Sequence, residues 1–558
     1  MADTRAAIQK LDARMKAMQI DRDSFDSHWS DIRDLIAPHR GRGLSGNSAS
    51  EDTDGSEKGG QIYDTTGLDA VKTTAAGMQS GLTPQSRPWF RLGFSDFDVS
   101  DSYAVRTWLS EVERRMRAVF AGSNFYNACF NTYSELAAFQ TAAFSIVEDF
   151  DTVIHCRPFT IGEYYLATGP RGNVNTFVRK PWMTAIQMVE EFGREAVSAQ
   201  VKNAYDTQGN SETQYQVIHF IEPNDDRIDL KDARARMYRS IWYEASGNDG
   251  KPLRVRGFDE FPVMCPRWDV VGNAVYGTGG PGMDALPDVK GLQKMRENYY
   301  IATDMAINPP LQAPSDMRYE EINDIPGGMS YVNNMNGQRP GIQPLHEVEV
   351  NPEKIQTAMM QDRVSVERKF YVDLFRMISS MPLRSGTTAT EIAERHEEKL
   401  LILGPVLERI QSEMLNPSID RTFAIMLRLG SIPPPPPEIQ GRPIKVEYVG
   451  LLAQAQKIVC LGAVETFAGF VGSVSAVAPD VLDKVDFDET LELYADGLGI
   501  SPTILRPDAE VQAIREARAQ KQQAEQQGAS MLAAADGAKT LSETDMASDS
   551  ALNQMLGR

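Results

Sequence analysis

The sequence is organised around residues 284–310, which read DALPDVKGLQKMRENYYIATDMAINPP. Proline is favoured in the first turn of a helix and an acidic residue near its N-terminus, so we expect a helix to start at Pro287 and Asp288. Apolar residues then recur three and four positions apart, which places them on one helix face. The run Asn308-Pro309-Pro310 ends the pattern, because proline cannot continue a helix. A single rod of helix is predicted.

A second and a third helix follow the same logic. Asn351 is a good N-cap and Pro352 suits a first helical turn, so a helix is predicted from there to Ser379. A short loop follows, and Thr388-Ala389-Thr390-Glu391 fits a capping box that opens a long helix. Interior prolines at 405 and 417 predict a bend at each place.

The insert at 309–351, between the first two helices, is rich in proline and glycine. Such a composition predicts turns joined by short strands, and strand-like runs lie near Ser330–Val332 and His346–Val350. The edges of these strands are candidates for pairing with a neighbouring chain.

Composition limits the classes of function. The chain has 558 residues and a net charge of −20, which argues against tight, charge-driven binding of nucleic acid. It still allows a protein that lets DNA pass without adhering to it. The four cysteines, Cys129, Cys156, Cys265 and Cys460, are far apart and unpaired by any CxxC, so reduced thiols are expected.

Before the first rod, the sequence predicts a body of helices followed by strands. Residues 1–36 carry two apolar stripes, which predict helix in two pieces. Residues 40–60 have almost no large apolar side chain and predict a mobile loop or insertion. Residues 64–275 then alternate helical patterns with short β-like runs, so a helix-rich, mixed α+β fold with an antiparallel meander is expected.

After the long helix the patterns are weaker. Ile458–Ala478 has the length of a membrane span, but it carries Glu465 and is dominated by small residues, which favours a helix packed in an assembly. Leu505–Gln527 predicts an exposed helix. Residues 528–558 have the composition of a flexible tail. No secretory signal is visible in the charged N-terminal segment.

Motifs for catalysis are weak or missing. The string Gly277-Thr278-Gly279-Gly280-Pro281-Gly282 matches a dinucleotide-binding pattern, but a proline interrupts it and Asp284 would face the phosphate, so a turn that aims the next helix is favoured. The sequence has no P-loop, and its six histidines are scattered. We therefore predict no catalytic residue, no cofactor and no metal ion.

Several strings, in order along the chain, resemble the portal, or head-to-tail connecting, proteins of short-tailed bacteriophages. They are Val178–Thr184, Phe192-Gly193, Pro266-Arg267-Trp268, Val275-Tyr276-Gly277, Asp288–Leu292, Asn308–Leu311, Thr388–Ile392 with Arg395, Ala453–Lys457 and Ala513–Arg518. The match runs from about residue 20 to 525. Each string is short, and their order and spacing together carry the resemblance.

The resemblance implies a portal fold with wing, stem, clip and crown. It assigns residues 1–283 to the wing, 284–308 and 352–379 to two stem helices, 309–351 to the clip, 380–388 to a tunnel loop, 389–430 to a long kinked wing helix, 431–527 to the crown and 528–558 to a flexible tail. The 40–60 loop and the tail have no family pattern, so no role is assigned to them.

The resemblance also implies a function. It predicts a non-enzymatic ring, a dodecamer, made in the host cytoplasm and placed at one capsid vertex of the virion. Double-stranded DNA would pass through its channel during packaging and ejection. The packaging motor (terminase), the tail adaptor, capsid and scaffold proteins would be its partners, with no membrane. Clip residues for docking would be Arg318, Tyr319, Tyr331 and Arg339.

The loop after the second helix is the candidate DNA-facing site. From the residues alone, an interhelical loop with Met381 and Leu383 packed inward is favoured, since Arg384 is its one charge. The resemblance implies instead a tunnel loop that steadies DNA weakly. Its residues are Ser380, Met381, Pro382, Leu383, Arg384, Ser385, Gly386 and Thr387.

Two other classes of function compete with the portal. One is an enzyme whose site is assembled from residues distant in sequence. The other is a different virion protein, such as an adaptor or scaffold. The oligomeric mass and the presence of rings in electron micrographs distinguish the three.

Overall fold

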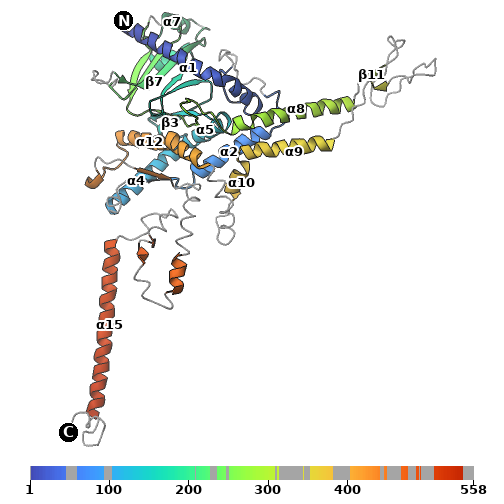
Figure 1. Ribbon diagram of the computed structural model, residues 1–558. Coiled ribbons are helices and arrows are strands. Elements are labelled where there is room, and N and C mark those ends of the chain that lie inside the picture. The colour runs from blue at the N-terminus through green and yellow to red at the C-terminus, as the bar shows by residue number, and fades with distance from the viewer. Residues whose placement is uncertain are drawn as a thin grey trace, which may run out of the picture. The chain divides into compact units, whose positions relative to one another are not determined.

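The chain was analysed as a computed structural model (Figure 1). The residues it describes are 2–44, 59–93, 103–207, 209–225, 235–246, 250–307, 311–312, 343–344, 352–380, 403–439, 445–448, 467–474, 485–488, 490–491 and 508–543. They divide into two compact units. The first comprises Met1–Leu92, Val112–Pro434 and Lys445–Lys457, and the second comprises Gly93–Glu111, Pro435–Ile444 and Ile458–Arg558.

Helices and strands are both plentiful, so the predicted helix-rich α+β class is confirmed. The helices are α1 (Ala2–Leu35), α2 (Thr66–Leu82), α4 (Tyr103–Gly122), α5 (Phe125–Phe139), α6 (Ala185–Phe192), α7 (Ala199–Asp206), α8 (Pro281–Ile307), α9 (Pro352–Lys369), α10 (Val372–Ser380), α12 (Asn416–Arg428) and α15 (Asp508–Glu543). The strands are β1 (Phe90–Gly93), β2 (Ala143–Asp149), β3 (Val153–Phe159), β4 (Tyr164–Thr168), β5 (Val174–Arg179), β6 (Trp182–Thr184), β7 (Gln214–Pro223), β8 (Tyr238–Glu244), β9 (Arg254–Phe258), β10 (Val263–Met264), β11 (Leu311–Gln312), β12 (Gln343–Pro344) and β13 (Lys445–Tyr448).

The largest sheet in the described part of the chain is antiparallel, in the order β4-β5-β7-β8-β9, with β6 paired to β7. Helix α1 covers one of its faces. Leu11, Met15 and Met18 pack there against Val178 and Tyr243 of the sheet. The prediction of two helical pieces for residues 1–36 is wrong, because both apolar stripes lie on one uninterrupted helix.

The main core joins the sheets to the helices. It includes Trp29 of α1 and Ile36 just after that helix, Phe139 of α5, Phe177 of β5 and Val289 of α8. A second, three-stranded sheet, in the order β10-β2-β3, borders this region. The antiparallel meander predicted for the body is therefore present, although β5, β6, β9 and the helix α7 were not predicted.

The segment predicted as a mobile loop at 40–60 begins with fixed residues. The guanidinium of Arg40 donates to the carboxylate of Glu135 at 3.1 Å, and the backbone N–H of Gly41 donates to Thr160 Oγ1 at 2.6 Å. Leu44 is buried in the main core. The prediction is wrong for residues 40–44, and residues 45–58 lie outside the described part.

In the second unit, α15 is the longest helix described. Its side chains are exposed almost throughout residues 510–534, as predicted for an exposed helix. It runs to Glu543, so residues 528–543, predicted as part of a flexible tail, are helical, and residues 544–558 lie outside the described part. No helix among the described residues is long and apolar enough to cross a membrane.

Candidate functional site: the paired helices and their base

Helix α8 begins where the glycine string ends. A β carbon at Gly282 would lie 2.0 Å from the carbonyl oxygen of Ala138, and one at Gly277 would lie 2.3 Å from that of Gln140. These glycines let the backbone approach the C-terminus of α5. The predicted start at Pro287 is wrong: α8 starts at Pro281, and Pro287 lies inside it.

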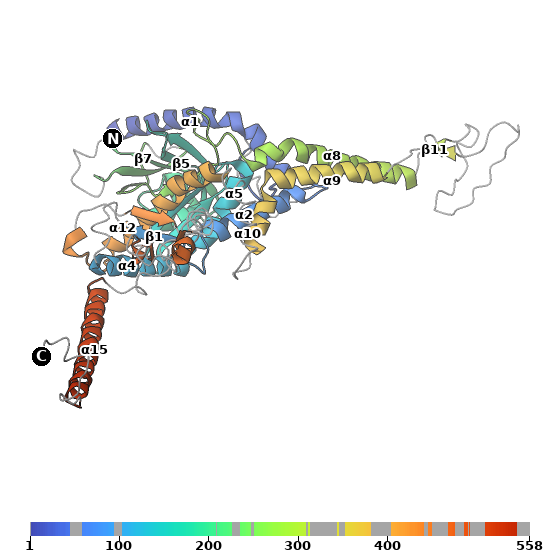
Figure 2. The same ribbon diagram turned by 60° about the horizontal axis from the view of Figure 1, so that its bottom comes forward.

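Helices α8 and α9 lie side by side (Figures 1 and 2). An ionic contact fixes their register near the base of the pair. Asp288 Oδ2 of α8 accepts hydrogen bonds from Ser365 Oγ at 2.5 Å and from Lys369 Nζ at 2.8 Å of α9. Burial raises the pKa of Asp288, but these hydrogen bonds outweigh it and hold the pKa below its ordinary value.

A buried carboxylate ties both helices to the body. Gln293 Oε1 of α8 accepts from the backbone N–H of Asp64 at 2.8 Å, and Arg363 Nη2 of α9 donates to Asp64 Oδ2 at 2.6 Å. Asp64 Oδ1 also accepts from the backbone N–H of Thr66 at the start of α2. Burial raises the pKa of Asp64, but the hydrogen bonds from Thr66 and Arg363 hold it lower than usual.

Away from this base, several apolar side chains of α8 and α9 are exposed. The buried residues of α8 all lie between Pro281 and Gln293. The exposed apolar residues farther along α8 and on α9 are Tyr300, Ile301, Met305, Ile307, Met360 and Val364. Several exposed apolar residues on one hairpin of helices are typical of a surface that binds another chain.

The second predicted stem helix, 352–379, is broken. Helix α9 ends at Lys369 and α10 starts at Val372. Tyr371 between them has φ of 55°, a left-handed conformation that is uncommon for a bulky residue. Its ring stacks on Trp268 at a centroid distance of 6.3 Å, while Phe370 is fully buried. The break is therefore held by packing on both sides.

Most of the predicted site residues lie outside the described part. Of the tunnel loop, Ser380 is the last residue of α10, and residues 381–388 are not described. The clip residues Arg318, Tyr319, Tyr331 and Arg339, and the two strand runs predicted for the clip, are also outside. At the base of the insert, β11 pairs antiparallel with β12, with Leu311 opposite Pro344.

The long helix predicted after the loop is described from residue 403. A π-helical turn, η3 (Gln411–Leu415), precedes α12, and Pro417 sits in the first turn of α12. The bends predicted at Pro405 and Pro417 stay predictions, and a π turn, a helical form often found at kinks, lies just before Pro417. Residues 389–402 lie outside the described part.

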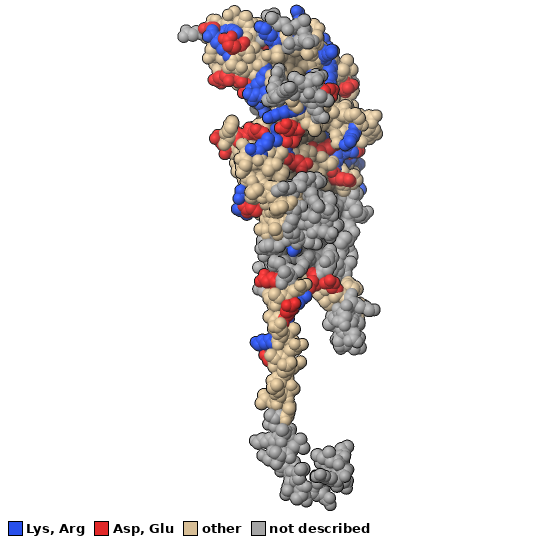
Figure 3. All heavy atoms as spheres, turned by 90° about the vertical axis from the view of Figure 1, so that its left-hand side faces the viewer, with Lys and Arg blue, Asp and Glu red and all other residues tan. Residues whose placement is uncertain are grey.

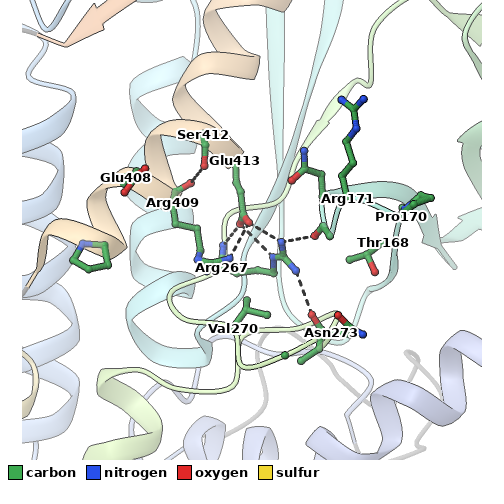
Figure 4. Close-up of a pocket in the computed structure, with 16 residues that line it drawn as sticks. Thr168, Pro170, Arg171, Arg267, Val270, Asn273, Glu408, Arg409, Ser412 and Glu413 are labelled. Carbon is green, nitrogen blue, oxygen red and sulfur yellow. Dashed lines mark hydrogen bonds and ion pairs between the residues drawn. The ribbon is translucent and has the colours of Figure 1, made fainter.

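The π turn contributes Glu413 to a buried ion pair. Its Oε1 lies 2.6 Å from Arg267 Nη2, and the two side chains are only 12% and 3% exposed. Arg267 also donates to the carbonyl oxygens of Gly172, Ala274 and Val275. A pocket of about 710 Å³ opens beside the pair, and in Figure 4 Arg171 points away from Arg267.

Side chains that bind metal ions do not cluster in the described part of the chain. No cluster of three or more His, Cys, Asp or Glu is placed to hold a metal ion within the ranges given above. Cys129, Cys156 and Cys265 are buried free thiols, as predicted, and burial raises the pKa of Cys156 to about 12. Cys460 is outside the described residues.

The sequence is similar to those of known phage proteins. The family described as "Bacteriophage head to tail connecting protein" matches residues 8–505. The "Portal protein" of Salmonella phage epsilon15 is 41% identical over 553 residues, 99% of this chain and 98% of that protein. The "Probable portal protein" of Bordetella phage BPP-1 is 40% identical over 544 residues, 97% of each chain.

A solved structure titled "Neck of empty GTA particle computed with C6 symmetry" aligns with 72% of this chain and 87% of that chain. Its TM-score is 0.32 and its identity 11%, a likeness too slight to carry an argument. The family and the two phage proteins decide between a connector and an enzyme. The chain belongs to the bacteriophage head to tail connecting protein family, as a portal protein.

Proposed function

We propose that copies of this chain form a ring, a dodecamer, at one vertex of the capsid, and that double-stranded DNA passes through its centre. The observation that carries this proposal is the α8–α9 pair. Asp288 joins the two helices to each other and Asp64 ties them to the body, while the remaining length of the pair exposes apolar side chains. Subunits that meet head to tail in a ring need two complementary surfaces on each copy, and a stiff pair of helices supplies them.

The segments at each end of the pair receive roles in this proposal. Residues 309–351 form the clip, where Arg318, Tyr319, Tyr331 and Arg339 contact first the packaging motor and later the tail adaptor. The loop 380–388 faces the channel, where Arg384 and the serine hydroxyls contact phosphate weakly. The net charge of −20 supports a channel wall with little continuous basic surface.

The remaining assignments also stay proposals. The body before residue 284 would be the wing, the 389–430 segment would cross it, and residues 431–527 would form the crown. Synthesis in the host cytoplasm and contacts with capsid and scaffold proteins complete the proposal.

Electron microscopy of the purified protein tests the ring. We expect particles with a wide central hole, and a monomeric or dimeric protein would contradict the proposal. The loop is tested separately by deleting Ser380–Ser385, with a glycine-serine segment of equal length as the control. Rings should persist in both variants, while packaged genome length falls in the deletion. Normal genome length and infectivity in the deletion would remove the loop's role.

A further inference from the structure

A row of four side chains crosses the large sheet in register. Arg179 of β5 lies opposite His219 of β7, His219 opposite Trp242 of β8, and Trp242 opposite Arg254 of β9. Directly opposite residues of neighbouring strands point to the same face of a sheet. Because α1 packs against Val178 and Tyr243, which alternate with this row, the row lies on the face away from α1.

The four side chains stack on one another. The His219 and Trp242 rings are parallel, with centroids 3.8 Å apart and an interplanar angle of 11°. The Arg179 guanidinium lies 4.9 Å from the Trp242 ring centroid, and that of Arg254 lies 5.0 Å from the Phe192 ring. The guanidiniums are thus held in fixed planes by aromatic rings, which prepares them for a planar partner.

Positive charge exceeds negative charge at this row. Arg179 Nε donates to His219 Nδ1 at 3.3 Å, and within the described ranges Arg179 forms no ion pair. Burial, and then the nearby Arg157, lower the pKa of Arg179 to about 9, while the carboxylates of Glu163 and Glu191 act in the opposite direction. Glu191 pairs with Arg254, and Glu163 lies 3.8 Å from Arg42.

His219 does not supply a compensating charge. Burial, and then Arg179, Arg254 and Arg157, lower its pKa well below the ordinary value, so the ring is neutral. Glu163 and Glu191 lie near Arg179, but no described carboxylate forms an ion pair with it, so a further carboxylate can engage its guanidinium N–H groups with two parallel hydrogen bonds. Such a site is incomplete until an anion arrives.

We propose that Arg179, with Arg157 at its rim, is a docking site for a carboxylate side chain of a second copy of this chain. The chain has 77 Asp and Glu against 57 Lys and Arg, so a neighbouring copy offers carboxylates widely, whereas the same acidic field repels the phosphates of DNA at long range. In Figure 3, Lys and Arg gather over the upper part of one face, among scattered Asp and Glu. The inference rests on the proposed ring, in which unlike surfaces of neighbouring copies meet.

The test compares Arg179→Gln and Arg157→Gln with the matched control Arg171→Gln, an exposed arginine of the 169–173 turn. Ring formation of the full chain is measured by sedimentation over a range of protein and salt concentrations. We expect Arg179→Gln and Arg157→Gln to raise the concentration for half-assembly at least about tenfold and to weaken its salt dependence. Arg171→Gln should match the unmodified protein.

Arg157 is exposed, so we expect Arg157→Gln to fold normally. A change in its assembly would therefore not be explained by misfolding. Circular dichroism checks the fold of Arg179→Gln. If both variants assemble as the unmodified protein does, the inference is wrong and the proposed ring stands. If assembly is unchanged but binding of a DNA duplex falls, the site takes phosphate and the inference is overturned. An unmodified protein that forms no ring would overturn the ring itself.

Discussion

The hydroxyl of Thr74 in α2 donates a 2.7 Å hydrogen bond to the carbonyl oxygen of Phe370, at the break between α9 and α10. A helix that ends inside a protein leaves carbonyl groups without helical partners, and each needs another donor. Thr74 is fully buried and also contacts the carbonyl oxygen of Ala70 at 2.9 Å. Helix α2 therefore supplies a hydrogen-bond donor for the backbone at the break.

Replacing this threonine tests the support. Thr74→Val keeps the shape of the side chain but leaves the Phe370 carbonyl buried without its donor, so we expect a loss of about 1–3 kcal/mol in the free energy of unfolding. Urea denaturation followed by tryptophan fluorescence measures it. Thr73→Val is the matched control, because Thr73 makes a similar contact to Asp69 at the surface. Equal losses in both variants would contradict the assigned role.

The close approach of α2 and α10 gives a second prediction. A β carbon at Gly77 would lie 2.3 Å from Cβ of Phe375, so Gly77→Ala should destabilise the chain by about 1–3 kcal/mol. Gly291→Ala in α8 is the control, since its β carbon would meet nothing nearer than 3.9 Å. There we expect a gain of about 0.5–1 kcal/mol from helix propensity. Thermal melting of both variants decides the matter.

The ion pair of Arg267 and Glu413 gives a third. Glu413→Ala leaves a buried guanidinium unpaired, which should cost about 3–5 kcal/mol in the free energy of unfolding. Replacing both partners, with Arg267→Met and Glu413→Leu, should recover most of this loss. The exposed pair of Lys294 and Glu297 is the control, and Glu297→Ala should cost less than about 1 kcal/mol. A double variant as unstable as Glu413→Ala would show that the hydrogen bonds of Arg267 to carbonyl oxygens contribute more to stability than the ion pair does.

Glu113 of α4 should make stability depend on pH. Burial raises its pKa from 4.5 to about 6, against the hydrogen bond from the Leu92 N–H and the charges of Arg91 and Arg117. The folded chain therefore holds this proton more tightly than the unfolded chain, so the stability it contributes is present below pH 4.5 and is lost as pH rises through 6.

Glu113→Gln keeps an oxygen acceptor for Leu92 and removes the titration. The free energy of unfolding of the variant, relative to that of the unmodified chain, should increase by about 1–2 kcal/mol from pH 5 to pH 8. Denaturation at both values measures the difference. A gain that is equal at the two pH values would contradict the titration of this carboxyl.

The exposed side chains of α9 test the proposed contact between copies. Val364 is 56% exposed, so a charge there is tolerated in a single chain. If this face is buried between copies, the charge introduced in Val364→Glu should raise the protein concentration needed for ring assembly by about tenfold or more. Gln361→Glu, an exposed position on the same helix, should assemble normally. Rings of unchanged stability in Val364→Glu would place this face outside the contact.

The parts of the fold that the sequence predicted rest on local signals. Pro352 marks the start of α9, as its favoured place in a first helical turn predicted. The apolar periodicity of α4 and α5 was also sufficient. The break at Tyr371 was missed because its φ of 55° is imposed by tertiary contacts. The sequence around it has no glycine or proline that would predict a break.

Other errors have the same origin. The start of α8 was placed at Pro287, since the requirement for Gly277 and Gly282 appears only when the end of α5 lies against them. The row of Arg179, His219, Trp242 and Arg254 was not predicted, because its members are joined by strand register across a sheet. The sequence alone does not give the register that brings them together.

The contact of Gly282 with Ala138 also has a mechanical consequence. Helix α8 has 27 residues, so it is a lever of about 40 Å whose fulcrum is this contact of backbone with backbone. Backbone atoms in van der Waals contact cannot yield by changing a rotamer. A sideways force on the far end of α8 would therefore be transmitted to α5 and the core around it, because no side chain at this contact can change its rotamer to relieve the force.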